Sequence, residues 1–315
     1  MNTDQALQKM TDVLRRKHLA LSTEQCYCAW LRRYCDYIRK LPAHFTSEQK
    51  LERFLTALAK DDVAASTQNQ AFNAILFFYQ EAMGMPLENV QALRARRPEQ
   101  IRHAPTRDDP LLLLKTVQAD ADFAVSLAVR LLYGCGLRVT EPLSLRLKDV
   151  ALESMQLTIR AAKGGKDRVV AMPCSVVEDL RAQVEAARVI WKQDQLKQVP
   201  LALPHQLAAK YPQAQFDWNW AWLFPAPEPC LAPRTGQRVR WRLHEANIQR
   251  AIRTACRKKG LLILPHELRH AYATHCLNRG ANPRAIQEAM GHKSLETTMA
   301  YLHAEALGVH SPLDG

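Results

Sequence analysis

The sequence predicts a mainly helical protein of two parts, with one small antiparallel sheet in the second part. Three observations predict this class. The first hundred residues hold four amphipathic helical patterns in succession. A charged stretch with two prolines follows them, and beyond it two short alternating runs flank a Gly-Gly turn inside otherwise helical sequence. We therefore expect a helical domain at residues 1–97, a linker at 98–109 and a larger domain at 110–315.

The first domain begins with two predicted helices. One lies near residues 3–17. The segment Ser22-Thr23-Glu24-Gln25 then has the spacing of a capping box and predicts the start of the second helix. Apolar residues repeat at helical spacing along this second helix and predict one buried stripe: Tyr27, Trp30, Leu31, Tyr34 and Ile38.

Two further helices complete a predicted four-helix bundle. The third follows Ser47, and the fourth runs from Ser66 to Gly84, with a polar first half. Amide side chains at a helix start can reach base edges and phosphates in a major groove, or can simply solvate the first turn. The candidate DNA-contacting residues of this helix are Gln68, Asn69, Gln70 and Asn73.

The second domain is predicted to be helical around one β-hairpin. Its strands are the runs MQLTIR and RVVAM, which flank AAKGGKD and place Lys163 at the end of the first strand. A segment at about 199–233 interrupts the pattern with prolines and tryptophans. Helices are expected at about 110–118, 121–133, 175–197, 244–259, 265–279, 284–290 and 295–306.

Composition and charge are typical of a folded protein that binds phosphate polymers. The 315 residues carry 43 Lys and Arg against 31 Asp and Glu, which gives +12 with neutral histidines. Residues 231–260 hold nine basic side chains and the single acid Glu245. Such a field attracts nucleic acid, although a solvated helix face would have the same composition.

No membrane segment or secretory signal is recognised in the sequence. No run approaches about 18 uncharged apolar residues, and MNTDQALQKM lacks the apolar centre of a signal peptide. We expect a cytoplasmic protein without a membrane partner. The eight cysteines form no CxxC pair, so they are expected to be reduced thiols without a functional role.

Four residues near the C-terminus have the chemistry needed to attack a phosphodiester. They are His266, Arg269, His292 and Tyr301. Arginine presents a fork of donors to phosphate oxygens, histidine exchanges protons near neutral pH, and a tyrosine hydroxyl can bond covalently to phosphorus. A lone tyrosine beside Leu295, Met299 and Leu302 would be interpreted as a core residue, so the chemical interpretation depends on the whole set.

The segment from His266 to His270 also matches HExxH, the pattern of zinc metalloproteases. In that pattern two histidines one turn apart bind the metal and the glutamate acts as a base. Glu288 could supply a third ligand by its spacing. A protease gives no reason for the basic excess or for the later GHxSxxTTxxY segment, so zinc is the alternative rather than the preferred interpretation.

The motifs GLRVTE, AAKGGKDR, HELRH, GH and TTMAY together resemble the tyrosine recombinase (phage integrase-like) family over nearly the whole chain. Within that family the sequence is similar to the integron integrases, because of VAASTQNQAFNAILFFYQEAMG, LPHQLAAKYPQAQFDWNWAWLFP and GVHSPLDG. The resemblance implies an N-terminal SAM-like core-binding domain and a catalytic domain with an integron-type insertion at 199–233.

The resemblance implies one active site made of Arg138, Lys163, His266, Arg269, His292 and Tyr301. Tyr301 would form a 3′-phosphotyrosyl bond while a 5′-hydroxyl leaves, and the two arginines would neutralise the non-bridging oxygens. Lys163 would be the general acid, His266 would manage the tyrosine proton, and His292 would donate to a phosphate oxygen. Glu141, one turn after Arg138, would orient that arginine or brace the helix, and His270 would be structural.

The implied activity is integration and excision of gene cassettes on double-stranded integron sites and folded single-stranded cassette sites. No cofactor is expected, neither ATP nor a metal, because the covalent intermediate keeps the bond energy. A homotetramer on DNA, associated with the nucleoid, is implied. Further DNA contacts are expected from Trp220, Pro233, Arg240, Trp241 and Arg242. A DNA-binding protein without catalysis is the second alternative.

Overall fold

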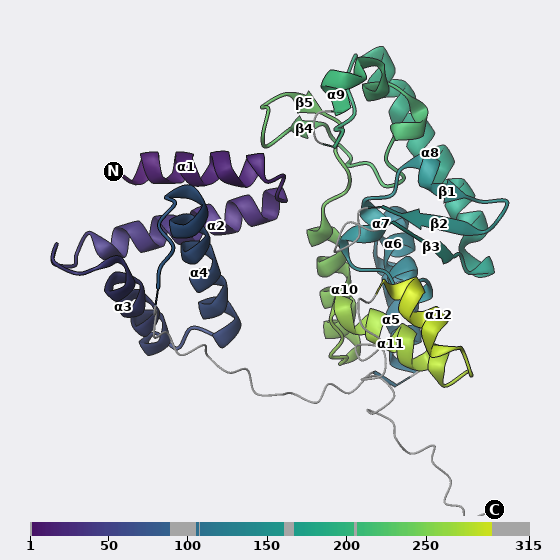
Figure 1. Ribbon diagram of the computed structural model, residues 1–315. Coiled ribbons are helices and arrows are strands. Elements are labelled where there is room, and N and C mark those ends of the chain that lie inside the picture. Colours follow the sequence, from purple (N-terminus) through teal and green to yellow (C-terminus); the bar gives the residue numbers. More distant parts are fainter. Residues whose placement is uncertain (1, 89–104, 107, 161–166, 205–206, 292–315) are drawn as a thin grey trace, which may run out of the picture. The chain divides into compact units, whose positions relative to one another are not determined.

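The computed structural model describes residues 2–88, 105–106, 108–160, 167–204 and 207–291. The chain divides into two compact units, Met1–Gln100 and Ile101–Gly315 (Figure 1). Each unit has its own apolar core. Among the described helices, none is both long enough and apolar enough to cross a bilayer.

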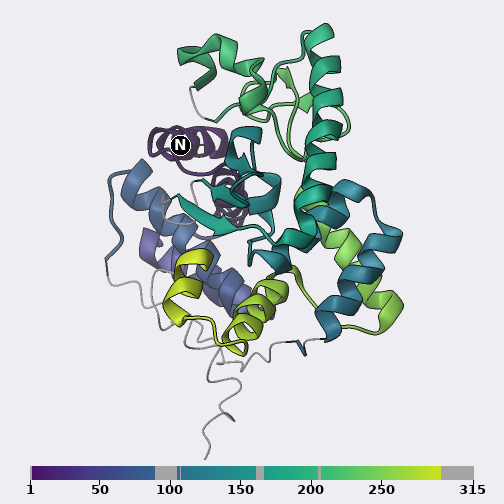
Figure 2. The ribbon, with the colours of Figure 1, turned by 90° about the vertical axis from the view of Figure 1, so that its right-hand side faces the viewer.

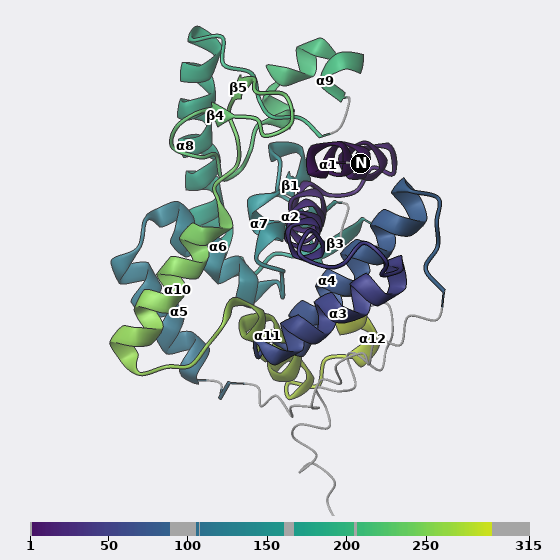
Figure 3. The same ribbon diagram turned by 90° about the vertical axis from the view of Figure 1, so that its left-hand side faces the viewer.

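The first unit is a bundle of four helices that ends in a π-helical turn (Figures 1 and 3). Its elements are α1 (Thr3–Arg16), α2 (Leu21–Ile38), α3 (Ser47–Lys60), α4 (Ala65–Phe77) and the π-turn Phe78–Ala82. Trp30, Leu31 and Tyr34 of α2 are buried against α1, α3 and α4, which confirms most of the predicted stripe, while Tyr27 and Ile38 are half-buried. The apolar spacing of 3.6 residues thus places one face of each helix in a common core.

The predicted capping box at Ser22 is wrong. Helix α2 begins at Leu21 after Ala20, with no side-chain cap, and Ser22 lies inside its first turn. Glu24 instead pairs with Arg15 of α1 at 2.9 Å, which ties the first two helices together. Capping boxes are found instead at α1, where Asn2 accepts from the Gln5 amide, and at α3, where Thr46 accepts from the Gln49 amide.

The second unit packs helices α5, α6, α10 and α11 around the larger core (Figures 1 and 2). Helices α5 and α10 run side by side, and α6 also contacts α8. The helices are α5 (Asp108–Asp120), α6 (Phe123–Gly134), α7 (Thr140–Leu143), α8 (Val177–Leu196), α9 (Leu207–Lys210), α10 (Glu245–Lys259), α11 (Pro265–Leu277) and α12 (Pro283–Met290).

Two small antiparallel sheets accompany these helices. The predicted hairpin is confirmed as β2 (Gln156–Ile159) and β3 (Arg168–Ala171), with Leu157 opposite Val170. A short strand β1 (Val150–Ala151) adds to its edge, so the order is β1-β2-β3. The second sheet, β4 (Cys230–Leu231) with β5 (Arg238–Val239), was not predicted because strands of two residues leave no alternating pattern.

Candidate active site

Arg138 is placed by a glycine turn at the end of α6. Gly136 has φ +61°, and the Leu137 amide donates to the Leu132 carbonyl at 3.1 Å, as in a Schellman motif. A Cβ atom at Gly136 would lie 2.4 Å from the ring of Tyr272. Both the backbone conformation and the close approach of that ring therefore require glycine immediately before Leu137 and Arg138.

Arg269 of α11 joins this turn to the end of α12. Its Nη1 donates to the Gly136 carbonyl at 2.6 Å, and its Nη2 donates to the Met290 carbonyl. The side chain is buried in the second unit. Arg269 is thus held beside the glycine turn that carries Arg138, and beside Gly291, which ends α12 with φ +63°.

The carboxylate of Glu141 lies between three guanidinium groups. Oε2 accepts from the Arg138 amide and Oε1 from Arg138 Nη1, both at 2.8 Å. Arg168 of β3 donates to both oxygens, at 3.0 and 2.7 Å, and Arg269 Nη1 lies 3.9 Å from Oε2. Three positive charges and one negative charge leave a positive excess, which suits an anionic ligand.

The pKa of Glu141 reflects these neighbours. Burial by itself would raise it, but hydrogen bonds from Arg168 and from the backbone and side chain of Arg138 outweigh burial and hold the pKa below its usual value. Glu141 is therefore ionised at neutral pH. Its charge reduces the repulsion among the arginines and fixes the orientation of Arg138, which is one of the two roles considered from the sequence.

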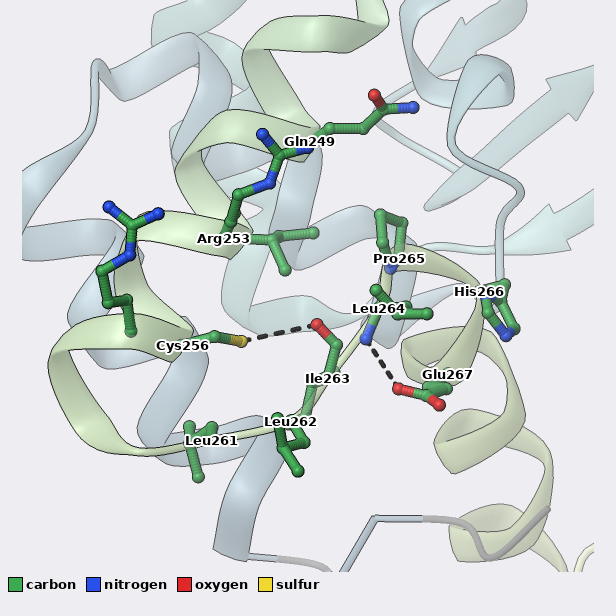
Figure 4. Close-up of a pocket in the computed structure, with 12 residues that line it drawn as sticks. Gln249, Arg253, Cys256, Leu261, Leu262, Ile263, Leu264, Pro265, His266 and Glu267 are labelled. Atoms are coloured by element: carbon green, nitrogen blue, oxygen red, sulfur yellow. Dashed lines mark hydrogen bonds between the residues drawn. The ribbon is translucent and has the colours of Figure 1, made fainter.

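His266 lies in the first turn of α11 and is exposed. It borders a pocket of about 740 Å³ between α10 and the start of α11, which Gln249, Arg253 and Cys256 also line (Figure 4). The His266 ring packs edge-on against His270, with centroids 5.7 Å apart. His266 is therefore open to solvent, whereas Arg269, one turn further along α11, is buried.

Three predicted site residues lie outside the described residues: Lys163, His292 and Tyr301. Lys163 belongs to the connection between β2 and β3, whose ends are Ile159 and Arg168. His292 follows Gly291 directly in the sequence, and the predicted helix at 295–306 also lies beyond the described residues.

The zinc interpretation of HExxH does not fit the described geometry. Glu267 accepts from the Leu264 amide at 2.6 Å and so caps α11 (Figure 4). Glu288 is exposed and pairs with Arg284 at 3.1 Å. In the part of the chain that the structure describes, no three His, Cys, Asp or Glu side chains gather to hold a metal ion.

The polar start of α4 is partly used within its own unit. Gln68 donates to the Val63 carbonyl at 2.6 Å, and Gln70 accepts from the Trp30 indole at 3.2 Å. Asn69 is half-buried, whereas Asn73 is exposed. Of the four candidate DNA contacts, Gln68 and Gln70 thus have structural roles, and Asn73 is exposed on the surface of α4.

Trp220 and Trp222 have different environments in the insertion. Trp222 is buried, with Arg146 Cζ 3.0 Å from its ring centroid, and its indole donates to the Arg240 carbonyl. Trp220 is half-buried, and Lys148 Nζ lies 3.0 Å from its centroid. Trp222 therefore anchors the insertion, whereas Trp220 retains some exposure.

Pro233 is exposed in the loop between β4 and β5. Trp218 packs edge-on against Trp191 of α8, with centroids 5.4 Å apart. This contact joins the insertion to the long helix. Trp218 and Trp222 are thus both anchors, whereas Pro233 is exposed.

The prediction that Arg240 contacts DNA needs correction. Its Nε and Nη2 donate to both oxygens of Asp194 at 2.6 Å, and its Nη1 donates to the Ala226 and Pro227 carbonyls. Both partners are almost fully buried. Arg240 is therefore a structural residue. Its donors meet acceptors inside the protein, so burial rather than sequence position decides its role.

Trp241 and Arg242 are both half-buried. Trp241 packs against the small cluster of Ala202, Trp222 and Val239. Burial lowers the pKa of Arg242, although an arginine keeps its charge at neutral pH. These two residues border the insertion, and Arg242 adds a positive charge there.

Sequence reasoning missed Arg168 and Arg146. Arg168 shares the inward face of β3 with Val170, so an arginine on the buried face of a predicted strand was the available signal. Arg146 is buried and donates to the Trp220 and Ala202 carbonyls, each at 2.7 Å. No local pattern around Arg146 indicates these two distant partners.

Comparison with known proteins agrees with the fold. Residues 106–307 match the phage integrase family, and residues 6–89 match the phage integrase N-terminal SAM-like domain. An "Integrase/recombinase" of Escherichia coli is 34% identical over 318 residues, covering 98% of this chain and 93% of its own length. The "Tyrosine recombinase XerA" of Thermococcus kodakarensis is 28% identical, covering 89% of this chain and 83% of its own.

Two solved structures share the fold. One is the XerH site-specific recombinase bound to palindromic difH substrate, with a TM-score of 0.61, 18% identity and coverage of 98% and 84% of the two chains. The other is a lambda integrase dimer bound to a COC′ core site, with a TM-score of 0.63, 16% identity and coverage of 98% and 97%. At these identities the likeness shows the fold.

The family match and the relatives define a tyrosine recombinase, an enzyme that cleaves and rejoins DNA. The chain belongs to the phage integrase family, because the family match covers more than half of its residues. This membership excludes the zinc protease suggested by HExxH.

Proposed function

We propose that this enzyme recombines specific DNA sites through a 3′-phosphotyrosyl intermediate, with Tyr301 as the nucleophile. The observation that carries the proposal is the meeting of Arg138 and Arg269 at Glu141, beside the end of α12. The segment with His292 and Tyr301 begins immediately after that point in the sequence. The proposed nucleophile, Tyr301, therefore belongs to the segment that follows the arginine cluster in the sequence.

The proposed step breaks one P–O bond and forms another. The Tyr301 oxygen attacks phosphorus, and the 5′-oxygen of the next nucleotide leaves with a proton from Lys163. Charge on the non-bridging oxygens rises in the transition state, where the preorganised Arg138 and Arg269 stabilise it by several kcal/mol, on the order found for oxyanion donors. Attack by a 5′-hydroxyl of the partner strand reverses the step and joins the exchanged strands.

The two histidines have separate proposed roles. His266 is exposed at the first turn of α11, where it can exchange the tyrosine proton with solvent. His292 would donate to a phosphate oxygen. The cleaved bond energy is kept in the protein-DNA ester, so neither ATP nor a metal has a place in this chemistry.

The test is a covalent trap on a nicked double-stranded recombination site. The wild-type protein should form a protein-DNA adduct that survives denaturing electrophoresis, and Tyr301→Phe should form none while it binds the same DNA. Tyr37→Phe is the matched control, because it removes the same hydroxyl from a tyrosine that donates to the Arg53 carbonyl in the first unit. It should give the wild-type yield of adduct.

The same assay separates the alternatives. DNA affinity without an adduct in the wild-type protein would show a binding protein that does not cleave. An adduct that persists in Tyr301→Phe would assign the nucleophile to another residue. Loss of the adduct in the presence of a chelator would require a metal and would contradict the proposed chemistry.

We further propose that the substrates are integron cassette sites, in which a folded single strand presents protruding bases. Support comes from the resemblance to integron integrases and from Trp220, a half-buried indole with Lys148 against its ring. Stacking of a base on an aromatic ring contributes about 1–3 kcal/mol. Pro233 and Arg242 are candidate neighbours of such a base, whereas buried Arg240 is not.

Covalent yield on a folded bottom-strand cassette site should exceed the yield on the same site as a duplex. Trp220→Ala should remove this preference and leave cleavage of a double-stranded integron site near wild type. Equal yields on both forms with the wild-type protein would contradict the cassette proposal without affecting the recombinase proposal.

A homotetramer on two DNA arms, in the cytoplasm and on the nucleoid, completes the proposal. The solved XerH and lambda integrase structures are complexes with DNA, which supports a DNA partner for this fold. Residues 302–315 are the proposed segment that packs into a neighbouring subunit. Analytical ultracentrifugation with a synaptic DNA substrate should show four protomers, and removal of residues 302–315 should reduce the assembly to smaller complexes.

A further inference from the structure

Arg168 occupies an unusual position for a strand residue. It begins β3, yet its side chain is only 8% exposed and reaches residues far away in the sequence. Its two Nη atoms donate to both oxygens of Glu141, at 3.0 and 2.7 Å. Its Nε donates to the Ala289 carbonyl at 2.7 Å, in the last turn of α12. One side chain thus joins three separate elements.

The exit of α12 is packed directly against Arg168. A Cβ atom added to Gly291 would lie 3.2 Å from Arg168 Cδ, and the φ of Gly291 is +63°. Glycine therefore permits both the left-handed backbone and the close approach of the arginine. The Arg168 side chain thus packs against this turn and is hydrogen-bonded to Ala289, in the last helical turn before it.

Arg168 also occupies acceptor positions on the Glu141 carboxylate that Arg269 could otherwise bind. Both carboxylate oxygens already accept from Arg138 and Arg168, and Arg269 remains at 3.9 Å. Without Arg168, Glu141 would have a free acceptor site next to Arg269. A closer ion pair there would neutralise a guanidinium that the phosphate needs.

We propose that Arg168 is a positioning residue for strand cleavage. It holds Glu141 in the orientation that aligns Arg138 and leaves Arg269 available, and it anchors the turn at Gly291. This inference rests on the proposed recombinase function. Arg168 itself need not touch the DNA, since each of its contacts named above is made to the protein.

Three substitutions separate the contacts of Arg168. Arg168→Gln keeps a donor near the place of Nε, able to reach the Ala289 carbonyl, but loses the fork that binds Glu141. Arg168→Met has a side chain of similar length but loses the hydrogen bonds both to Glu141 and to the Ala289 carbonyl. Arg168→Lys keeps a single charge, which can meet Glu141 at one point but cannot replace the fork and the Nε bond together.

The experiment is single-turnover cleavage of the nicked double-stranded site with protein in excess. Arg168→Gln should lower the rate of adduct formation about tenfold and Arg168→Met more, since misplacement of catalytic groups by about 1 Å can cost up to 10²-fold. Arg168→Lys should lie between Arg168→Gln and wild type. DNA affinity, measured by fluorescence anisotropy, should stay within about twofold of wild type, because Arg168 acts on positioning.

A double-mutant cycle with Glu141→Gln tests the route of the effect. If Arg168 acts through Glu141, adding Arg168→Gln to the Glu141→Gln variant should lower the rate of adduct formation by less than about twofold. The same substitution in the wild-type protein should lower that rate far more. Equal effects in both backgrounds would overturn the proposed route.

Arg130→Gln is the matched control. Arg130 of α6 also joins a carboxylate, that of Asp179, to a backbone carbonyl, that of Ser175 at 2.7 Å. Its loss should lower thermal stability and leave the cleavage rate of the folded protein unchanged. A cleavage rate that falls equally in Arg130→Gln and Arg168→Gln would mean a general structural role and would overturn the inference.

The outcomes distinguish this inference from the proposed function. Absence of an adduct with wild-type protein would reject the recombinase proposal itself. A wild-type adduct formed equally fast by Arg168→Gln would reject the role of Arg168 alone. If Arg168→Gln fails to fold, Arg168→Lys decides: a folded protein slowed about threefold or more supports the role, by loss of the fork geometry, and an unchanged rate overturns it.

Discussion

Arg269 Nη1 donates a 2.6 Å hydrogen bond to the carbonyl oxygen of Gly136. The bond connects α11 to the turn after α6, across 133 residues of sequence. Because Arg138 lies two residues beyond Gly136, the position of one proposed catalytic arginine is tied to that of the other. A change at either end of this bond should therefore affect both arginines.

Gly136→Ala should destabilise the protein and slow cleavage. The new Cβ would lie 2.4 Å from the Tyr272 ring, and φ is +61°. Gly236→Ala is the control, because φ there is +68° but nothing lies within 4 Å. The backbone penalty of about 1–2 kcal/mol is common to both. Urea unfolding should show a larger loss for Gly136→Ala, and equal losses would contradict the predicted clash.

Arg269→Lys should abolish most cleavage. An ammonium group cannot donate to the Gly136 and Met290 carbonyls in the geometry of the guanidinium fork, and it cannot bind a phosphate in two places. We expect a loss of about 10²–10³-fold in the adduct rate, the range for removal of one preorganised donor. A variant that retains the wild-type rate and stability would show that the fork is not needed.

Stability should depend on the charge of Glu141 in acid. The pKa of folded Glu141 lies below the ordinary value of 4.5, so ionised Glu141 stabilises the fold above that value. The contribution is lost as the pH falls through the folded pKa. The difference in urea midpoint between wild type and Glu141→Gln should be largest near neutral pH and shrink below 4.5. A difference that grows toward acid would contradict this linkage.

Arg240→Met should destabilise the insertion without weakening DNA binding by the folded protein. The substitution leaves Asp194 buried without its partner, and breaking a buried pair in this way costs about 3–5 kcal/mol. Thermal unfolding measures the loss. The double variant with Asp194→Leu should recover part of it, because no buried charge then remains. A weaker DNA affinity with unchanged stability would restore Arg240 as a DNA contact.

Trp222→Ala and Trp220→Ala should have different effects. Trp222 is 8% exposed and contacts Arg146 and the Arg240 carbonyl, so its removal should cost about 3–5 kcal/mol of stability. Trp220 is half-buried, and its removal should cost less stability and reduce adduct yield mainly on the folded single-stranded site. Calorimetry and the covalent assay measure the two effects, and equal stability losses would contradict the distinction.

Local patterns predicted most of the elements. Apolar spacing of 3.6 residues predicted the helices of both units, and the alternating runs predicted β2 and β3. The start of α2 was predicted wrongly, because Ser22 and Glu24 had the spacing of a cap while Glu24 pairs with Arg15 of another helix. Glu24 had the spacing for a cap and the charge for an ion pair, and the neighbouring helix α1 supplies the partner for the ion pair.

The sequence by itself determined the class of chemistry, since arginines, histidines and a tyrosine in this order are suited to phosphodiester attack. It also predicted Glu141 as the partner of Arg138, three residues away. Only the tertiary structure decided that Arg168 shares Glu141 and binds Ala289, and that Arg240 is buried with Asp194. The spacing of apolar residues in the sequence indicates which face of a helix or strand is buried. The partner of a buried charged residue, in contrast, depends on which distant segments pack together in the folded protein.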